Sequence, residues 1–275
     1  MRIFLVVTGR EALERLLAQG WKNILISWEH QSLIKRVLNE RNVNLIIDSA
    51  AYIAWTKGKE IDIDKYVDFC KEIQHHHLNS LVIVNLDIIP GRFGFVPSKE
   101  DIEKSAIKGW ENYEKMKKSG LNVMHLFHQY EDIKWLKKLM AEDTDYIGIS
   151  PANDLHSKAR LKWLKGVFSI VRDKKKTHGF GVTDLKILKE IPFYSADSSN
   201  WKSMARYGNS SIYHQLETRT VFYKKLKDAL AMELNSESLI DSKKLTKAEH
   251  KIVYQTGQCQ EDLTKLWKIR GVEFD

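Results

Sequence analysis

The sequence predicts one (β/α)8 barrel of the TIM-barrel class over residues 1–210, followed by a C-terminal helical extension. Short apolar runs alternate with amphipathic helical stretches as far as about residue 207, and there are eight such runs. Eight strands, each followed by a helix, is the number that a closed parallel barrel requires. The length of 275 residues also suits this class. An open doubly wound sheet is the alternative, but Gly179-Phe-Gly181 is only a weak counterpart of its glycine-rich dinucleotide loop.

Hydrophobic periodicity places the elements along the chain. The expected strands are Ile3–Val7, Asn23–Ser27, Leu45–Asp48, Leu81–Asp87, Val123–His128, Tyr146–Ser150, Thr177–Phe180 and Phe193–Asp197. Apolar residues at three- and four-residue spacing predict helices over Glu11–Ala18, Asp64–Gln74, Lys99–Lys118, Asp132–Met140, Lys158–Arg172 and Asp184–Glu190. Residues 211–275 are expected to form an appended helical segment, with Leu226, Leu230 and Leu234 four apart and a second helix from Lys247 to Arg270.

Composition argues against several classes of protein. No apolar run reaches the roughly 18 residues that a membrane span needs. The N-terminal Met-Arg-Ile-Phe-Leu-Val-Val is too short an apolar stretch for a signal peptide. The two cysteines, Cys70 and Cys259, lie far apart without metal-ligand spacing, so neither a disulfide framework nor a zinc site is expected. We therefore expect a cytoplasmic protein that does not interact with membranes.

The formal net charge is +8, from 44 basic and 36 acidic residues. Such an excess suits a polyanionic partner, because lysine and arginine neutralise phosphates. The first basic stretch, which we expect to bind nucleic acid, contains Arg160, Lys162, Lys165, Arg172, Lys174, Lys175 and Lys176. A second stretch contains Lys224, Lys225, Lys227, Lys243, Lys244 and Lys247. The alternative is that both stretches are solvated helix faces without a nucleic-acid partner.

The strand ends define the candidate site, because catalytic groups of parallel barrels lie at the C-terminal ends of the strands. Polar residues occur at most of these ends, namely Asp48, Asp87, His128 with Gln129, Ser150 with Asn153, His178 and Asp197. Each aspartate could instead cap the helix that follows it. Each histidine alone could be a hydrogen-bonded core residue. The joint pattern favours a site, since caps do not have to occur on strand after strand.

These residue types favour carboxylate chemistry. The sequence contains no Gly-x-Ser-x-Gly nucleophile elbow, and neither cysteine lies at a strand end. The tract His75-His76-His77 cannot converge on one metal, because consecutive helical residues point about 100° apart. What remains is one aspartate as nucleophile or base, with others orienting a substrate. A carboxylate nucleophile suits displacement at a sugar anomeric carbon.

The strand-end motifs also resemble those of a known family. In order, they are Leu-Ile-Ile-Asp48-Ser-Ala-Ala-Tyr52, Asn-Leu-Asp87, Phe-His-Gln129, Tyr-Ile-Gly148-Ile-Ser, His178-Gly-Phe-Gly181 and Tyr-Ser-Ala-Asp197. The series resembles the tRNA-guanine transglycosylase superfamily, and within it the short, phage-type DNA-guanine transglycosylases that place 7-deazaguanines in DNA. The resemblance runs from about Leu45 to Trp201.

The resemblance implies a role for each matching position. Asp197 matches the nucleophile that attacks C1′ of the nucleotide and expels guanine, and Asp48 matches a second catalytic aspartate that handles the proton. The substrate-binding set that it implies is Asp87, Gln129 and Gly148 at the purine edge, Tyr52 stacked on the base, His178 facing it from the other side, and Ser49 and Ser150 in the same motifs. These roles imply a pentosyltransferase that needs no metal or organic cofactor.

Two departures from the family pattern bear on the substrate. The family's Asp-Ser-Gly-Gly signature is Asp48-Ser49-Ala50-Ala51 in this chain, which leaves the loop less backbone freedom. The cysteine-rich zinc site of the tRNA enzymes is missing, and this favours DNA over tRNA as the polymer. The expected partners are therefore DNA, or tRNA in the alternative, and a free 7-deazaguanine base, in a phage or bacterial host cytoplasm. A carboxylate-dependent glycosylase or hydrolase, and a barrel that only binds nucleic acid or a partner protein, are further alternatives.

Overall fold

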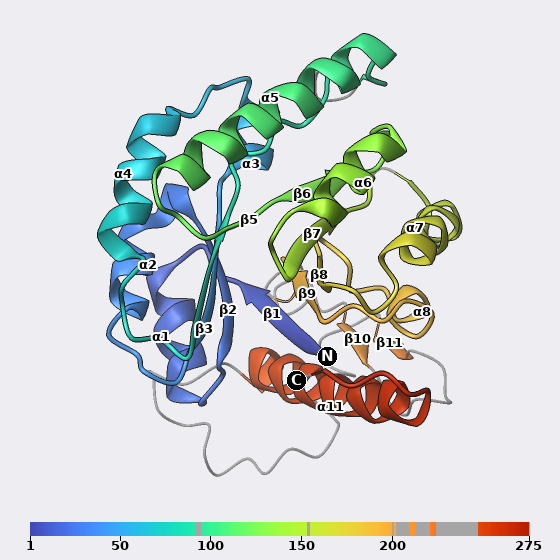
Figure 1. Cartoon of the computed structure of the whole chain (residues 1–275). Helices are drawn as coiled ribbons and strands as arrows, with labels where there is room; N and C mark the ends of the chain where they lie inside the picture. Colours follow the sequence, from blue (N-terminus) through green and yellow to red (C-terminus); the bar gives the residue numbers. More distant parts are fainter. Residues whose placement is uncertain are drawn as a thin grey trace.

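The structure, a computed structural model, describes residues 1–91, 95–152, 155–199, 201, 210–212, 221–223 and 247–274. Its main part is a curved parallel sheet with helices on the outside (Figure 1), and the predicted β/α barrel is thereby confirmed. The strands are β1 (Arg2–Val6), β2 (Asn23–Ser27), β3 (Asn44–Asp48), β4 (Ser80–Val84), β5 (Val123–Met124), β6 (Leu126–His128), β7 (Tyr146–Ser150), β8 (Lys176–Gly179) and β9 (Ser195–Ser198).

The strand order shows how the sheet nearly closes. Its nine strands run β5-β4-β3-β2-β1-β9-β8-β7-β6, so the two ends of the order are β5 and β6, which are separated in sequence only by His125. One stretch of chain therefore pairs with β4 on one side and with β7 on the other. The Met124 carbonyl accepts a hydrogen bond from Asn85 N (2.9 Å), and the His125 carbonyl accepts one from Gly148 N (2.8 Å). Counted this way, the barrel has the eight strand positions that the sequence predicts.

The helices surround this sheet. They are α1 (Arg10–Ala18), α2 (Gln31–Val37), α3 (Ala51–Lys57), α4 (Ile63–Ile73), α5 (Lys99–Lys118), α6 (Ile133–Ala141), α7 (Ser157–Val171) and α8 (Leu185–Leu188), with a 3-10 turn over Trp28–His30. The six predicted helices are confirmed to within two residues at each end. Asp62, Ser98, Asp132 and Asp184 cap four of them through their side chains. The helix caps identified here are thus not the strand-end aspartates.

Alternation along the strands divides the core into two layers. Every second residue along a strand points into the barrel, where Phe4, Leu25, Ile46, Val84 and Leu126 form one buried cluster. Their neighbours in sequence face the helices and join the larger cluster between sheet and helices. Because these apolar side chains fill the middle of the barrel, the inward-facing polar residues lie toward its two ends. The C-terminal end carries the candidate site.

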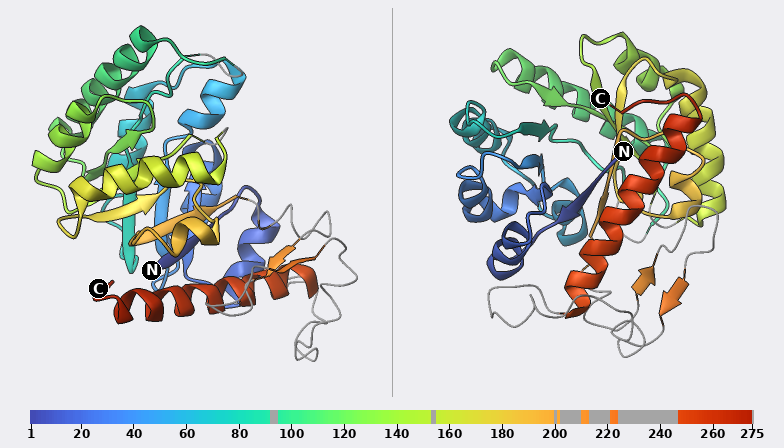
Figure 2. Two further views of the ribbon diagram at one scale, coloured as in Figure 1. Left: turned by 90° about the vertical axis from the view of Figure 1, so that its right-hand side faces the viewer. Right: turned by 90° about the horizontal axis from the view of Figure 1, so that it is seen from below.

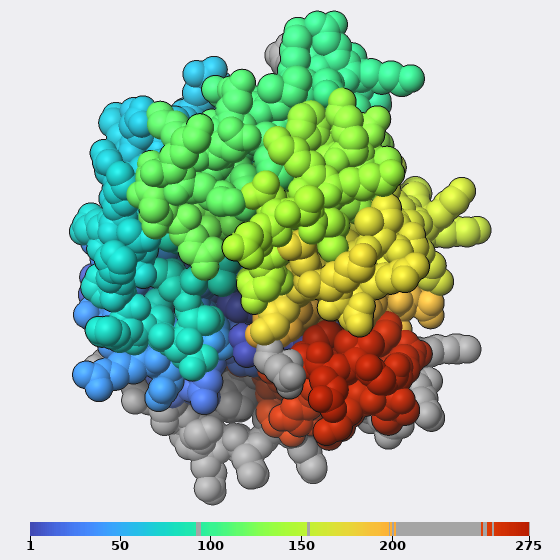
Figure 3. Space-filling view, viewed as in Figure 1, coloured from blue at the N-terminus to red at the C-terminus, as the bar shows by residue number. Residues whose placement is uncertain are grey.

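The long C-terminal helix α11 (Lys247–Ile269) packs across the opposite, N-terminal end of the barrel (Figure 2). The Met1 ammonium donates to Thr264 Oγ1 (2.8 Å), and the Ile3 amide donates to Gln260 Oε1 (2.8 Å). Trp267 is buried, and its indole N–H donates to the Leu188 carbonyl (3.0 Å). The space-filling view shows α11 lying directly against the α7–α8 side of the barrel (Figure 3).

The predicted helical extension is confirmed only in part. The second expected helix is α11, but Val221–Tyr223 forms strand β11, paired antiparallel with β10 (Ser210–Ile212), where helix was predicted. Leu226, Leu230 and Leu234 lie outside the described residues. Within the part of the chain that is described, every helix is too short or too polar to cross a lipid bilayer. Cys70 and Cys259 are buried free thiols, and burial raises the pKa of each to about 12.

Candidate active site

Three aspartates lie together at the C-terminal end of the barrel. Asp48 is the last residue of β3, Asp87 follows β4 by three residues, and Asp197 lies within β9. The predicted strand Leu81–Asp87 is shorter than expected, since β4 ends at Val84. The negative charges of Asp87 and Asp197 both act on Asp48 and raise its pKa. The three acids that the sequence predicts at the strand ends are thus close enough to interact.

Asp48 has a strongly perturbed carboxyl group. Burial is the main reason that its pKa is raised to about 7, and the charge of Asp87 adds to this effect. The Ala50 amide donates to Asp48 Oδ2 (3.1 Å), which opposes the rise only in part. A carboxyl group with a pKa near neutrality can both donate and accept a proton, as a general acid–base catalyst must.

The loop after Asp48 adopts a backbone conformation that glycine would prefer. Ala50 has φ 70° and ψ 15°, in the left-handed region. For a residue with a Cβ atom this conformation costs about 1 kcal/mol or more. The chain therefore keeps the turn that a glycine would make at this position although an alanine occupies it. Tyr130, beside Gln129, is a second strained residue at this end of the barrel, with φ 85°.

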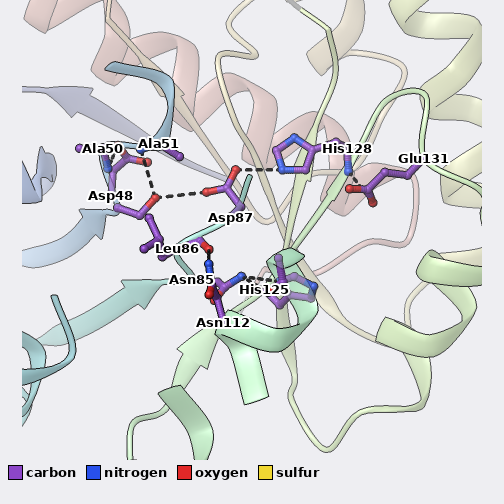
Figure 4. A network of polar contacts seen from close by, with 12 residues as sticks. Asp48, Ala50, Ala51, Asn85, Leu86, Asp87, Asn112, His125, His128 and Glu131 are labelled. Carbon is purple, nitrogen blue, oxygen red and sulfur yellow. Dashed lines mark hydrogen bonds and ion pairs between the residues drawn. The ribbon is translucent and has the colours of Figure 1, made fainter. Parts of the chain in front are cut away.

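Asp87 is held between two side chains (Figure 4). Ser49 is buried and donates from Oγ to Asp87 Oδ1 (3.1 Å). On the other side His128 Nε2 lies 2.9 Å from Asp87 Oδ2, an ion-pair distance, although the ring N–H does not point straight along it. The backbone amide of His128 donates to Glu131 Oε2 (3.3 Å). Ser49, Asp87, His128 and Glu131 thus form one connected polar row.

The charges in this row are coupled. Burial alone would lower the pKa of His128, but the contact with Asp87 and the charge of Glu131 outweigh it, so the pKa of His128 is raised. Burial raises the pKa of Glu131 to about 7, and the positive charge of His128 limits the rise. His128 was noted from the sequence without an assigned role, and Glu131 was missed. No sequence pattern marks Glu131, because its burial depends on the course of the loop after β6.

A second network behind this row is structural. Asn85 Nδ2 lies 3.0 Å from His125 Nδ1 and donates to the Gly109 carbonyl (2.9 Å). Asn112 donates to the Leu86 carbonyl (2.8 Å) and so fixes the chain that leads to Asp87. Burial lowers the pKa of His125 to about 3, which keeps this imidazole neutral.

Asp197 is oriented from β8. Gly181 N donates to Asp197 Oδ1 (2.7 Å), and His178 Nε2 lies 3.4 Å from the same oxygen. His178 is fully buried, with Nδ1 against the Ser195 hydroxyl. Since Oδ1 is held in this way, the aspartate has a fixed orientation at the base of the mouth. A fixed carboxylate is what a nucleophile of this type requires.

A cavity of about 500 Å³ opens next to His128, the residue that contacts Asp87. Its walls are Tyr52, Trp55, Ile89, Pro90, Phe95, Val96, Pro97, His128, Gln129, Tyr130, Ser150, Pro151 and Ala152. The size and the mixture of aromatic walls with a few polar groups are typical of a small-molecule site. Tyr52, Gln129 and Ser150, three of the predicted substrate-binding residues, line it. The three aspartates are not among the lining residues, and His128 belongs to both groups.

Gly148 and His178 lie deeper than the roles implied for them would suggest. They pair in register one layer below the mouth. The Gly148 amide is already bonded to the His125 carbonyl, and a Cβ atom on Gly148 would lie 2.7 Å from the Phe180 ring. Phe180 also contacts the His178 ring edge to face, with centroids 4.5 Å apart. In this structure Phe180, two residues nearer the mouth on the same strand face, separates both residues from the open end.

The first basic stretch does not form one surface. The 15 residues of α7 span about 22 Å from the mouth to the opposite end of the barrel. Arg160 lies near the mouth and donates to the Gly181 carbonyl (3.0 Å), whereas Arg172 and residues 174–176 precede β8 at the far end. Lys165 pairs with Glu190 (2.9 Å). Of the second stretch, Lys224, Lys225, Lys227, Lys243 and Lys244 lie outside the described residues, as does Asn153.

Neither a metal-ligand cluster nor a sequence match identifies this site. Among the residues that the structure describes, no three His, Cys, Asp or Glu side chains converge as metal ligands would. No model of a known protein family matches the chain, and no curated protein matches it. The functional interpretation therefore depends on the geometry of the site and on the motif resemblance.

Proposed function

We propose that the protein is a base-exchange glycosyltransferase that replaces guanine in DNA with a 7-deazaguanine of the preQ type. The observation that carries the proposal is the convergence of Asp48, Asp87 and Asp197, with the pKa of Asp48 raised to about 7 and with His128 linking Asp87 to an aromatic-lined cavity. The ordered resemblance of the strand-end motifs to the guanine transglycosylases supports it from the sequence.

In the first step Asp197 Oδ2 attacks C1′ of the target nucleotide. A bond forms between this oxygen and C1′, the C1′–N9 bond breaks, and its electron pair leaves on N9 of guanine. Protonated Asp48 gives its proton to the departing base. The product is a covalent glycosyl ester on Asp197, and the anionic site stabilises the oxocarbenium-like transition state.

In the second step the incoming 7-deazaguanine gives its N9 proton to ionised Asp48. N9 then attacks C1′, and the ester bond to Asp197 breaks. Both aspartates return to their starting states, and two displacements at one carbon give net retention of configuration with ping-pong kinetics. A group that must be an acid in one step and a base in the next works best with a pKa close to the working pH.

The cavity chemistry supports a planar base as the ligand. Tyr52, Trp55 and Tyr130 offer faces for stacking, and Gln129 and Ser150 offer polar groups at the edge. A base must leave the helical stack of a duplex before it can enter such a site. Tyr52 and Phe95 are 50% and 67% exposed at the rim, where neighbouring unpaired bases could stack on them.

The polymer is the less constrained part of the proposal. The net charge of +8 suits either nucleic acid. Among the basic residues of the first stretch, Arg160 is placed to meet a phosphate near the mouth, and residues 174–176 are not. The missing zinc site of the tRNA enzymes favours DNA.

The test is the exchange of radiolabelled guanine into DNA and, separately, into tRNA. Asp197→Asn should lower exchange by roughly 10⁴-fold or more while nucleic-acid binding is retained. Asp68→Asn, an exposed aspartate of α4, is the matched control and should exchange as the wild type does. Labelling of neither polymer by the wild type would contradict a transferase. Abasic sites formed without added base would indicate the hydrolase alternative.

A further inference from the structure

His128 lies where the cavity meets the aspartates. It lines the cavity together with Gln129, and its Nε2 is 2.9 Å from Asp87 Oδ2. Asp87 itself does not line the cavity, and its side chain is 8% exposed. A base in the cavity would therefore meet the imidazole before it meets the carboxylate.

The surroundings of His128 favour its protonated form. The groups that face it are the carboxylates of Asp87, from the loop after β4, and Glu131, from its own loop, together with neutral His125. Asp48 and Glu103 act one step further away, on Asp87 and Glu131 respectively. Among these groups, two carboxylates and no basic side chain face His128, so its imidazolium is the only positive charge. The pKa of His128 is accordingly raised in spite of its burial.

The neighbouring amide makes this wall a donor surface. Gln129 Oε1 accepts a hydrogen bond from the Ala152 amide (3.1 Å), which orients the carboxamide and leaves its NH2 group as the donor. An imidazolium offers two N–H donors. Nε2 lies 2.9 Å from Asp87 Oδ2, and Nδ1 is the donor left for a ligand in the cavity that His128 lines. Donors side by side fit a ligand edge that carries an acceptor.

We propose that His128 is a base-binding and specificity-determining residue, whose imidazolium donates a hydrogen bond to the 6-oxo group of the purine while Asp87 acts behind it as counterion. The inference rests on the proposed function and refines it, because Asp87 becomes a positioning residue that acts through His128. A 7-deazaguanine lacks the N7 acceptor, so on the O6/N7 edge O6 is the acceptor that guanine and the incoming base share.

The experiment measures binding of guanine and of 2-aminopurine, which lacks the 6-oxo group, by equilibrium dialysis at about pH 6 and about pH 8.5. In the wild type the affinity for guanine should fall as pH rises, by up to about tenfold per pH unit above the pKa of His128. His128→Phe should weaken guanine binding at the lower pH by roughly 5- to 100-fold. The same variant should change 2-aminopurine binding by about twofold or less.

Two variants separate the charge of His128 from its shape. His128→Asn keeps a neutral N–H donor near the position of Nδ1, so it should bind guanine with an affinity that no longer depends on pH. His76→Gln, an exposed histidine three residues after the end of α4, should behave as the wild type does. Equal losses for guanine and 2-aminopurine in His128→Phe, or an unchanged pH profile in His128→Asn, would overturn the proposal.

The pairing with Asp87 has a test that does not depend on ligand binding. In a ¹⁵N-labelled protein the pKa of His128 should fall in Asp87→Asn, because its nearest negative charge is removed. If His128 titrates identically in both proteins, the assigned counterion is wrong. If the wild type binds no guanine at all, the proposed function fails, and the histidine titration still decides whether the pair exists.

Discussion

Replacing Asp48 by Asn should make the protein more stable above neutral pH. The perturbation is small in shape, because an asparagine Oδ1 can still accept the hydrogen bond from the Ala50 amide that Asp48 Oδ2 accepts at 3.1 Å. It is large in charge, because Asp48 lies against Asp87 and Asp197 in a buried site. The variant therefore removes the cost of ionising this carboxyl group and leaves its local packing in place.

The magnitude follows from the difference between the two pKa values. The pKa of Asp48 is raised from 3.8 to about 7 on folding. Between these values the folded protein holds a proton that the unfolded chain has lost, so stability falls as pH rises. The raised pKa of Asp48 lowers the free energy of unfolding by roughly 1.5 kcal/mol at about pH 5 and by on the order of 4 kcal/mol at about pH 8. The free energy of unfolding of Asp48→Asn, relative to that of the wild type, should therefore rise by about 2.5 kcal/mol from about pH 5 to about pH 8.

The assay is urea unfolding of both proteins at the two pH values, followed by tryptophan fluorescence. Glu131 and His128 also change charge in this range, but they are present in both proteins and their contributions largely cancel in the difference. Asp68→Asn controls for the loss of one carboxylate at the surface. A stability difference between Asp48→Asn and the wild type that is the same at both pH values would refute the reasoning, because Asp48 would then ionise without cost.

Three further predictions concern stability and can be checked by the same unfolding measurement. Ala50→Gly should stabilise the protein by about 0.5 to 1 kcal/mol, because glycine relieves the left-handed backbone, whereas the neighbouring helical Ala51→Gly should destabilise it by a similar amount. Gly148→Ala should cost about 1 to 3 kcal/mol, since its Cβ would lie 2.7 Å from a buried ring. Trp267→Ala should lower the free energy of unfolding by about 3 to 5 kcal/mol, because the burial of Trp267 indicates that α11 is part of the barrel core. A change below about 1 kcal/mol would instead indicate a loosely attached helix.

Much of the barrel could be predicted from local sequence. The run Asn23–Ser27 is buried throughout, and the helix Lys99–Lys118 begins and ends where its periodicity predicts. The strand β11 could not be predicted, because three residues carry too little pattern to distinguish strand from helix. The break at His125 was also invisible, since it arises where one stretch of chain pairs with different neighbours on its two sides.

The candidate site divides in the same way. Asp48 and Asp197 could be found because an acid that directly ends an apolar run in a parallel barrel must point to one end of it. Gly148 and His178 were placed in the right strands, but the packing of Phe180 against both of them could not be predicted. The reason is that sequence gives the face of a strand residue, while its depth depends on the side chain above it, here Phe180.

The sequence by itself determined the alternation of strands and helices and the end of the barrel at which the acids gather, because both depend on short-range periodicity. Only the tertiary structure decided that His128 contacts Asp87 beside the cavity and that the basic stretch is divided between the two ends of α7. These features depend on the paths of the loops after β4 and β6 and on the length of a helix across the barrel. Such distances between remote parts of the chain are set by packing, so the spacing of residues along the sequence does not determine them.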